Sequence, residues 1–185
     1  MTVAEYVTEG LMKWCERKGR VLKITGAQGP DDVYLIRYYV LKHKWCNIFI
    51  HQFLRSDKDD LHDHPWDFVT YLVRGSYVEQ KFNTKLNTVQ VTRRANYIYN
   101  DFMTDVRMKM NTLVFRRATD QHRVVVKEDL KEVDKHKAAL TLFISGPTKR
   151  EWGFWKEEHT PGGILRVWSP WREYLGLPAD EPGRG

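Results

Sequence analysis

The chain has 185 residues and a mass of 22.0 kDa, the size of one domain, which excludes a second full catalytic domain. Hydrophobic residues make up 42 % and charged residues 29 %, a globular composition that excludes general disorder. The formal net charge of +6 favours anionic partners, but the basic residues are scattered in short pairs, so a small anionic ligand is a better expectation than nucleic acid.

Residues 1–20 are predicted to form an N-terminal helix, because apolar side chains recur along them at spacings of three and four. Thr2, with Glu5 three residues later, fits a capping box at its start. Gly19 is the residue type that favours a left-handed turn at a helix end. We expect this helix to pack on one face of a barrel domain formed by residues 21–175.

After the helix the pattern changes to short runs rich in Val, Ile, Tyr, Phe and Thr, with Gly, Pro and Asn between them. Many short strands at this spacing indicate an antiparallel sandwich or barrel. The predicted fold class is therefore all-β. The predicted strands are residues 21–24, 33–41, 48–54, 68–73, 77–82, 89–93, 112–116, 122–126 and 139–144.

Beyond residue 144 the chain becomes rich in Trp and Tyr. We predict an irregular aromatic cover on the barrel, with Pro170 starting a short helical turn through Tyr174. The tryptophans are expected mainly in the core, and the alternative is a surface that stacks a base or sugar at the barrel mouth. Residues 176–185 are rich in Pro and Gly and are expected to form a flexible tail.

The sequence lacks signals for export or membrane insertion. No stretch approaches the roughly 18 apolar residues of a spanning helix, and residues 1–10 do not read as a secretory signal. Cys15 and Cys46 lie far apart without a C-x-x-C pair, which is typical of reduced thiols. We expect a soluble cytoplasmic protein that makes no membrane contact.

The strongest chemical signal is the run LHDHPWDF at residues 61–68. In an extended strand His62 and His64 point to the same face while Asp63 points away, so two imidazoles can bind one ion. His122 begins a later Val-rich strand that an antiparallel sheet can bring alongside. Three neutral imidazoles suit one divalent transition metal, with Fe first and Mn, Ni, Cu or Zn as alternatives.

This pattern resembles the cupin superfamily across residues 45–146. His62-x-His64, then a strand and Gly75, then His122 on a later strand, is similar to the two-motif arrangement of cupins. With the HDHPW string, the chain resembles small uncharacterised cupin proteins of phage and bacterial genomes. The resemblance implies a double-stranded β-helix, the jelly-roll barrel, with the metal in its mouth. It also implies a possible homodimer, in the host cytoplasm if the protein is phage-encoded.

The chain departs from the usual cupin motifs in two places. The carboxylate expected shortly after the second histidine is missing, so Asp67 or Glu79 is a candidate fourth ligand, or three histidines suffice. We favour Glu79, as a ligand or a general base, because it follows the Gly75 turn on a neighbouring strand. Asn111 stands in a turn where Gly is usual, and Asn tolerates the left-handed region better than most residues.

Other residues are candidates for catalysis or substrate binding. His51 shares a strand face with aromatic residues, so we predict an acid, base or substrate contact, with a core histidine as the alternative. Tyr77 is assigned to catalysis together with Glu79, for which a surface salt bridge is the alternative, and Tyr71 to substrate binding. Arg116 and Arg123 flank His122 and are predicted to clamp a carboxylate or phosphate, unless one faces outward.

Three classes of function remain open on the sequence. The first is a metal-dependent, Fe(II)-type dioxygenase that acts on a small polar or anionic substrate. The second is a non-redox sugar or nucleotide-sugar isomerase or epimerase, which would use a histidine and a carboxylate as acid and base. The third is a non-enzymatic protein that binds a small nucleotide or another protein. Metal identity and oxygen consumption distinguish the three classes.

Overall fold

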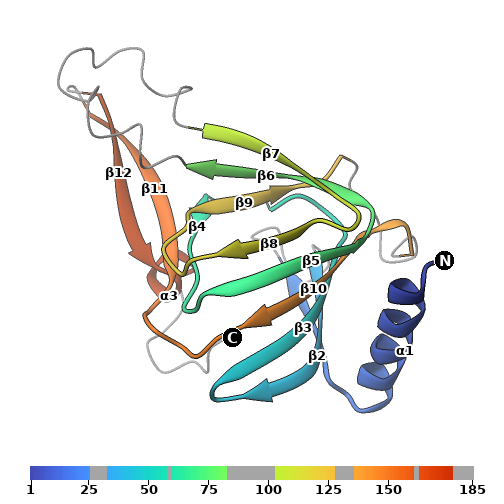
Figure 1. Cartoon of the computed structure of the whole chain (residues 1–185). Helices are drawn as coiled ribbons and strands as arrows, with labels where there is room; N and C mark the ends of the chain where they lie inside the picture. Colours follow the sequence, from blue (N-terminus) through green and yellow to red (C-terminus); the bar gives the residue numbers. More distant parts are fainter. Residues whose placement is uncertain (26–32, 58–59, 83–102, 128–135, 161–162, 177–185) are drawn as a thin grey trace.

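The computed structural model describes residues 1–25, 33–57, 60–82, 103–127, 136–160 and 163–176. Two six-stranded antiparallel sheets make up most of it (Figure 1). Sheet A has the order β1(Val21–Thr25), β2(Val33–His43), β3(Cys46–Phe53), β10(Ala139–Ser145), β5(Phe68–Arg74), β8(Leu113–Arg116). Sheet B has the order β12(Gly163–Pro170), β11(Gly153–Thr160), β4(Leu61–His62), β9(His122–Val125), β6(Ser76–Phe82), β7(Met103–Lys109).

The strand order identifies a jelly roll. The eight strands from β3 to β10 divide into β3, β10, β5 and β8 in sheet A and β4, β9, β6 and β7 in sheet B. The first strand of this set lies beside the last, and the second beside the second to last, which is the winding of two Greek keys into a double-stranded β-helix. The predicted all-β jelly-roll fold is confirmed.

The N-terminal helix α1(Val3–Arg17) starts at the predicted capping box. Thr2 Oγ1 accepts a hydrogen bond from the Glu5 amide at 3.2 Å, and the Glu5 carboxylate accepts one from the Thr2 amide at 2.6 Å. Gly19 follows the helix with a φ of 65°, in the left-handed region. Asn111 has a φ of 68°, so the turn expected there does form without glycine.

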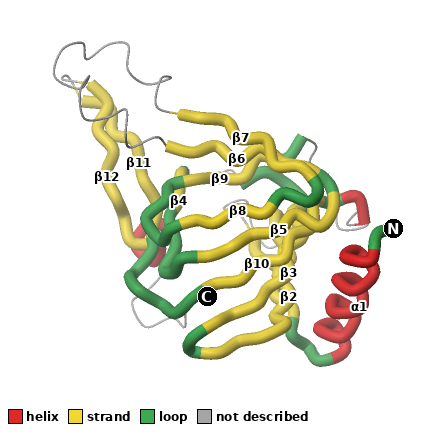
Figure 2. Tube along the Cα trace, viewed as in Figure 1, coloured by secondary structure: helices red, strands yellow, loops and turns green. Residues whose placement is uncertain are grey.

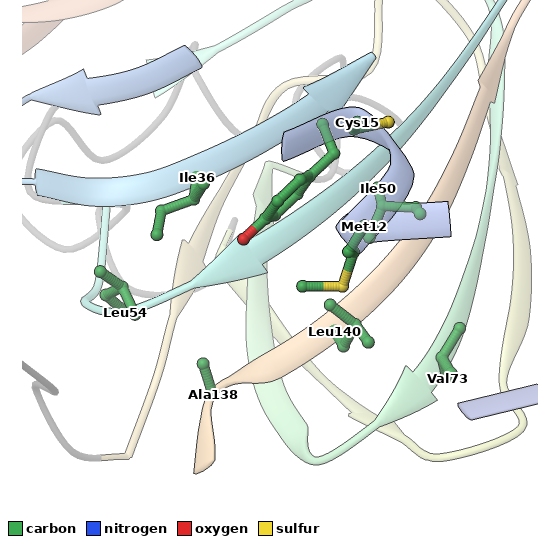
Figure 3. Close-up of a cluster of buried hydrophobic side chains, with 9 residues drawn as sticks. Met12, Cys15, Ile36, Ile50, Leu54, Val73, Ala138 and Leu140 are labelled. Carbon is green, nitrogen blue, oxygen red and sulfur yellow. The ribbon is translucent and has the colours of Figure 1, made fainter. Parts of the chain in front are cut away.

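Helix α1 covers the outer face of sheet A, the face turned away from sheet B. Its Met12 and Cys15 pack against Ile50 of β3 and Leu140 of β10 (Figure 3). Tyr38 of β2 belongs to the same cluster and is completely buried. Burial of this apolar surface removes it from water at roughly 25 cal/mol per Å² and holds the helix to the sheet.

The C-terminal segment differs from the predicted irregular cover. It forms a β-hairpin, β11 and β12, which extends sheet B beside β4 and is followed by the single turn α3(Trp171–Tyr174). Figure 2 shows this hairpin at the left of the view, with α1 at the right. The predicted strand at 89–93 and the predicted tail after residue 176 lie outside the described residues. None of the described helices is long and apolar enough to cross a membrane.

Candidate metal centre

Three histidines from different parts of the chain meet on the inner face of sheet B, the face turned toward sheet A. His62 of β4 pairs directly with His122 of β9, and His64 follows two residues after His62. Their candidate ligand atoms all lie within 4.8 Å of one another. Among the described residues they are the one group of this kind. The spacing of two in the sequence and the antiparallel return of β9 together produce this cluster.

The nearest pair of imidazole nitrogens is in contact. His64 Nε2 lies 2.7 Å from His122 Nε2. Two nitrogens bound to one metal at about 2.1 Å and at about a right angle would lie about 3 Å apart. The two rings thus already have nearly the separation that neighbouring ligands need.

A carboxylate lies near the Nδ1 atom of two of these rings. Glu79 Oε1 lies 2.6 Å from His122 Nδ1, and Asp57 Oδ2 lies 3.1 Å from His62 Nδ1. The hydrogen bond between Glu79 and His122 Nδ1 fixes the tautomer that leaves Nε2 of His122 with its lone pair, which is the usual support of a metal-binding histidine. Asp57 places a carboxylate beside the His62 ring at ion-pair distance. The donor set fits a divalent transition metal.

Glu79 is buried between His122 and Arg116 and is not exposed to the cavity. Arg116 donates from Nε to Glu79 Oε1 at 2.9 Å and from a terminal nitrogen to Oε2. Burial alone would raise the pKa of Glu79, but the hydrogen bonds from His122 and Arg116 outweigh it and lower this pKa to about 2. Both oxygens of Glu79 are thus engaged, which favours a role in supporting His122 over contact with an ion in the cavity. The predicted catalytic role of Glu79 and the predicted role of Arg116 as an anion clamp stay predictions, and the two side chains pair with each other.

Asp67, the competing carboxylate, is also engaged away from the histidines. It accepts from the Ala118 amide at 2.8 Å and from Lys149 Nζ at 2.6 Å. Both contacts fix the chain after the HDHPW segment. Among the described residues, therefore, neither predicted candidate completes the coordination, and the three-histidine alternative fits the geometry.

Asp63 points away from the cavity, as strand alternation predicted, and its side chain is completely buried. Its carboxylate accepts from the Gly153 amide at 2.8 Å, from Arg150 at 2.7 Å and from the Trp168 indole at 3.1 Å. These contacts attach the C-terminal hairpin to the peptide that carries His62 and His64. The alternation of side chains thus places metal-binding groups on one face of this peptide and its structural anchor on the other.

A cavity of about 600 Å³ lies between the sheets, and the three histidines line part of its wall. His51 of β3 and Tyr77 of β6 line it too, as their predicted roles require, and those roles stay predictions. Many of the other wall residues are aromatic, including Phe53, Phe68, Trp66, Phe143, Trp152, Phe154 and Trp171. Burial raises the pKa of Tyr77, so its phenol stays protonated and can donate a hydrogen bond.

Two of the predicted substrate-binding residues lie outside this cavity. Tyr71 is on the outer face of sheet A and donates to Asn111 Oδ1 at 2.8 Å. Arg123 follows His122 and therefore points to the outer face of sheet B, where it donates to Gln80 at 2.7 Å. Neither reaches the cavity wall. Their assignment to substrate binding is corrected.

Arg37 of β2 is a cavity residue that the sequence reasoning missed. It lines the wall beside His51, with which it is paired in register. Alternation along β2 relative to His51 was the available signal, but it could be used only once the register between the two strands was known.

Metal-free protein is expected to lose stability as the pH falls from about 7.5 to about 5.5. Burial lowers the pKa of His51, His64 and His122 below the ordinary value of 6.5. As the pH is lowered, the unfolded chain therefore takes up protons before the folded protein does. The free energy of unfolding decreases as a result, by at most about 1.4 kcal/mol per pH unit for each histidine. Urea denaturation with a chelator present measures the change. A His51→Gln variant should give a shallower slope, and a flat wild-type profile would contradict the expectation.

Comparison with solved structures gives distant matches to this chain. No protein-family model matches the sequence, and no curated protein does. A cupin-2 domain from Rhodospirillum rubrum is similar with a TM-score of 0.49 at 9 % identity, over 72 % of this chain and 73 % of that one. DMSP lyase DddQ from Ruegeria pomeroyi has a TM-score of 0.45 at 9 % identity, over 71 % and 56 %.

The Fe(II) form of HppE in complex with its substrate has a TM-score of 0.44 at 10 % identity. The match covers 68 % of this chain, which spans only 55 % of the HppE chain. The matches thus include cupin domains, the superfamily that the histidine motif resembles. At these scores no residue role passes from them to this chain, and the jelly-roll assignment rests on the strand order.

Proposed function

We propose that His62, His64 and His122 hold one divalent transition metal and that the protein is a metal-dependent dioxygenase of the Fe(II) type. The observation that supports this most is the meeting of three imidazoles, two of them with a carboxylate near Nδ1, on the wall of a cavity with many aromatic side chains. Imidazole suits Fe, Mn, Ni, Cu and Zn better than Mg or Ca. Three protein ligands leave coordination positions open.

The chain's own residues would prepare such a site in three ways. Glu79 holds His122 in the tautomer that presents Nε2, and Asp57 places a negative charge beside the His62 ring. The lowered pKa of His64 keeps its ring neutral and able to bind a metal at neutral pH. The aromatic wall keeps bulk water from a substrate inside the cavity. A bound Fe(II) would supply the ability to activate O2 beside a small polar or anionic substrate.

A second candidate function is a non-redox isomerase or epimerase. The pairs Glu79–His122 and Asp57–His62 are histidine–carboxylate pairs at the cavity, and such pairs can exchange protons with a sugar without any metal. The third alternative, a binding protein without catalytic activity, would use the same cavity. Localisation in the cytoplasm and formation of a homodimer stay predictions.

Metal content decides between these functions. We expect purified protein, reconstituted anaerobically with Fe(II), to hold about one iron per chain, the stoichiometry of a single three-histidine site. Nitric oxide should then give the electron paramagnetic resonance signal of an iron with an open position. If the protein holds zinc that Fe(II) cannot displace, the dioxygenase proposal is contradicted, whereas the proposed metal site is supported. Failure to bind any first-row divalent metal would contradict both and favour the acid–base alternative.

A further inference from the structure

Arg37 places a positive charge on the cavity wall of sheet A. Its Nε donates to His51 Nε2 at 3.0 Å, and its guanidinium lies over the Phe49 ring, 5.2 Å from the centroid. No carboxylate among the described residues pairs with it. Arg116, Arg150 and Arg166, by contrast, each have a carboxylate partner. A partly buried cation without a counter-ion is costly, and a bound anion would offset that cost.

We propose that Arg37 and His51 form a binding site for an oxyanion, and that the natural ligand is a small carboxylate or phosphonate-type anion with an apolar, planar body. This inference shares its cavity with the proposed metal centre and names the substrate class of that function. It does not require that a metal be bound, because Arg37 and His51 belong to sheet A and the histidine cluster to sheet B.

The contacts of Arg37 leave a suitable edge for an oxyanion. His51 accepts from Nε, and the guanidinium carbon lies over the Phe49 ring, so both contacts position the side chain. The two terminal nitrogens remain to donate two parallel hydrogen bonds, the bidentate geometry that arginine offers to carboxylates and phosphates. His51 can accept this bond only while Nε2 is unprotonated, and burial together with Arg37 lowers its pKa in that direction.

The aromatic side chains of the cavity wall indicate the chemical character of the ligand beyond its anionic group. Phe143 lies between the two sites, with its ring centroid 5.0 Å from that of His51 and 6.2 Å from that of His64. A ligand held by Arg37 would therefore lie along Phe143 with its other end toward the histidine cluster. Aromatic walls favour an apolar planar body over a polyhydroxylated one.

Binding of three small probes to chelator-treated, metal-free protein tests the proposal. The probes are benzoate, phenylphosphonate and the uncharged benzamide, with binding measured by titration calorimetry or ligand-observed NMR. We expect at least one of the two anions to bind about tenfold or more tightly than benzamide, because the charge adds bidentate hydrogen bonds. The Arg37→Gln variant should bind that anion with only the affinity that benzamide shows. The Arg123→Gln variant, changed on the outer face of sheet B, should bind it with wild-type affinity.

Three results would overturn the proposal: equal binding of benzamide and both anions, retained anion preference in Arg37→Gln, or no anion binding to the wild type. If Arg37→Gln fails to fold, Arg37→Lys replaces it as the test variant. Lysine keeps the positive charge but lacks the bidentate guanidinium edge, so this variant should bind the anion with intermediate affinity. Because the metal is removed, a positive result stands even if the proposed metal function fails. Stoichiometric metal binding with no anion preference would conversely leave the metal function intact and refute this site.

Discussion

Replacing His122 with alanine is expected to abolish stoichiometric metal binding while the jelly roll remains folded. His122 supplies the ligand from β9, and its removal leaves only His62 and His64, which chelate weakly. Loss of a supporting residue alone costs about 10- to 100-fold in metal affinity, so loss of a direct ligand should cost more than 100-fold. Titration of chelator-treated protein with Fe(II) or Co(II) measures the affinity, and circular dichroism measures the fold.

His43→Ala is the matched control, since His43 is an exposed histidine at the end of β2, next to the turn that leads to β3. It should leave metal binding at the wild-type level. Full metal occupancy in the His122→Ala protein would mean that the third ligand is misassigned. Equal losses in both variants would point to nonspecific binding by surface imidazoles.

Replacing Glu79 with glutamine is expected to reduce both stability and metal affinity. The buried Arg116 guanidinium would lose its charged partner, and breaking a buried ion pair costs about 3–5 kcal/mol when one partner is removed. His122 would lose its anionic support, which should weaken metal binding by about 10- to 100-fold. Asp67→Asn should cost only about 1 kcal/mol or less, because the Asp67–Lys149 pair is exposed. Urea denaturation and metal titration of both variants measure these effects.

A double variant separates the two roles of Glu79. Glu79→Gln with Arg116→Met removes the unpaired buried charge, so much of the lost stability should return. Metal affinity should stay low, because His122 still lacks its carboxylate. Recovery of metal affinity together with stability would contradict the support role, and a smaller effect of Glu79→Gln than of Asp67→Asn would contradict the geometry itself.

Most of the apolar strands could be predicted from the sequence, but β12, GILRVWSP, was missed together with its partner β11. The strands β7 and β11 were missed because their sequences, MTDVRMK and GFWKEEHT, carry charges where a buried strand has apolar residues. Such strands hold their place through pairing with neighbours, which local sequence does not reveal. The C-terminal hairpin was therefore interpreted as an irregular cover.

The candidate site could be predicted in part for a similar reason. Residues two apart point to the same face in any extended strand, so the common face of His62 and His64 could be predicted from the sequence. Tyr71 was misplaced because sheet A is buried on both faces, with Ile50 against α1 and Phe49 toward the cavity. Alternation cannot distinguish two buried faces. The ion pair between Glu79 and Arg116 depends on how strands distant in the sequence are placed in the fold, and no local sequence pattern predicts it.

The anchoring of Asp63 also has a consequence for the order in which the protein is made. Its partners Arg150 and Trp168 lie 87 and 105 residues further along the chain. Translation proceeds from the N-terminus, and contacts between such distant residues form slowly. The peptide that carries His62 and His64 thus leaves the ribosome long before the hairpin that anchors it. A nascent chain presents two loosely held imidazoles, and the complete ion-binding environment exists only after the last strands have been synthesised.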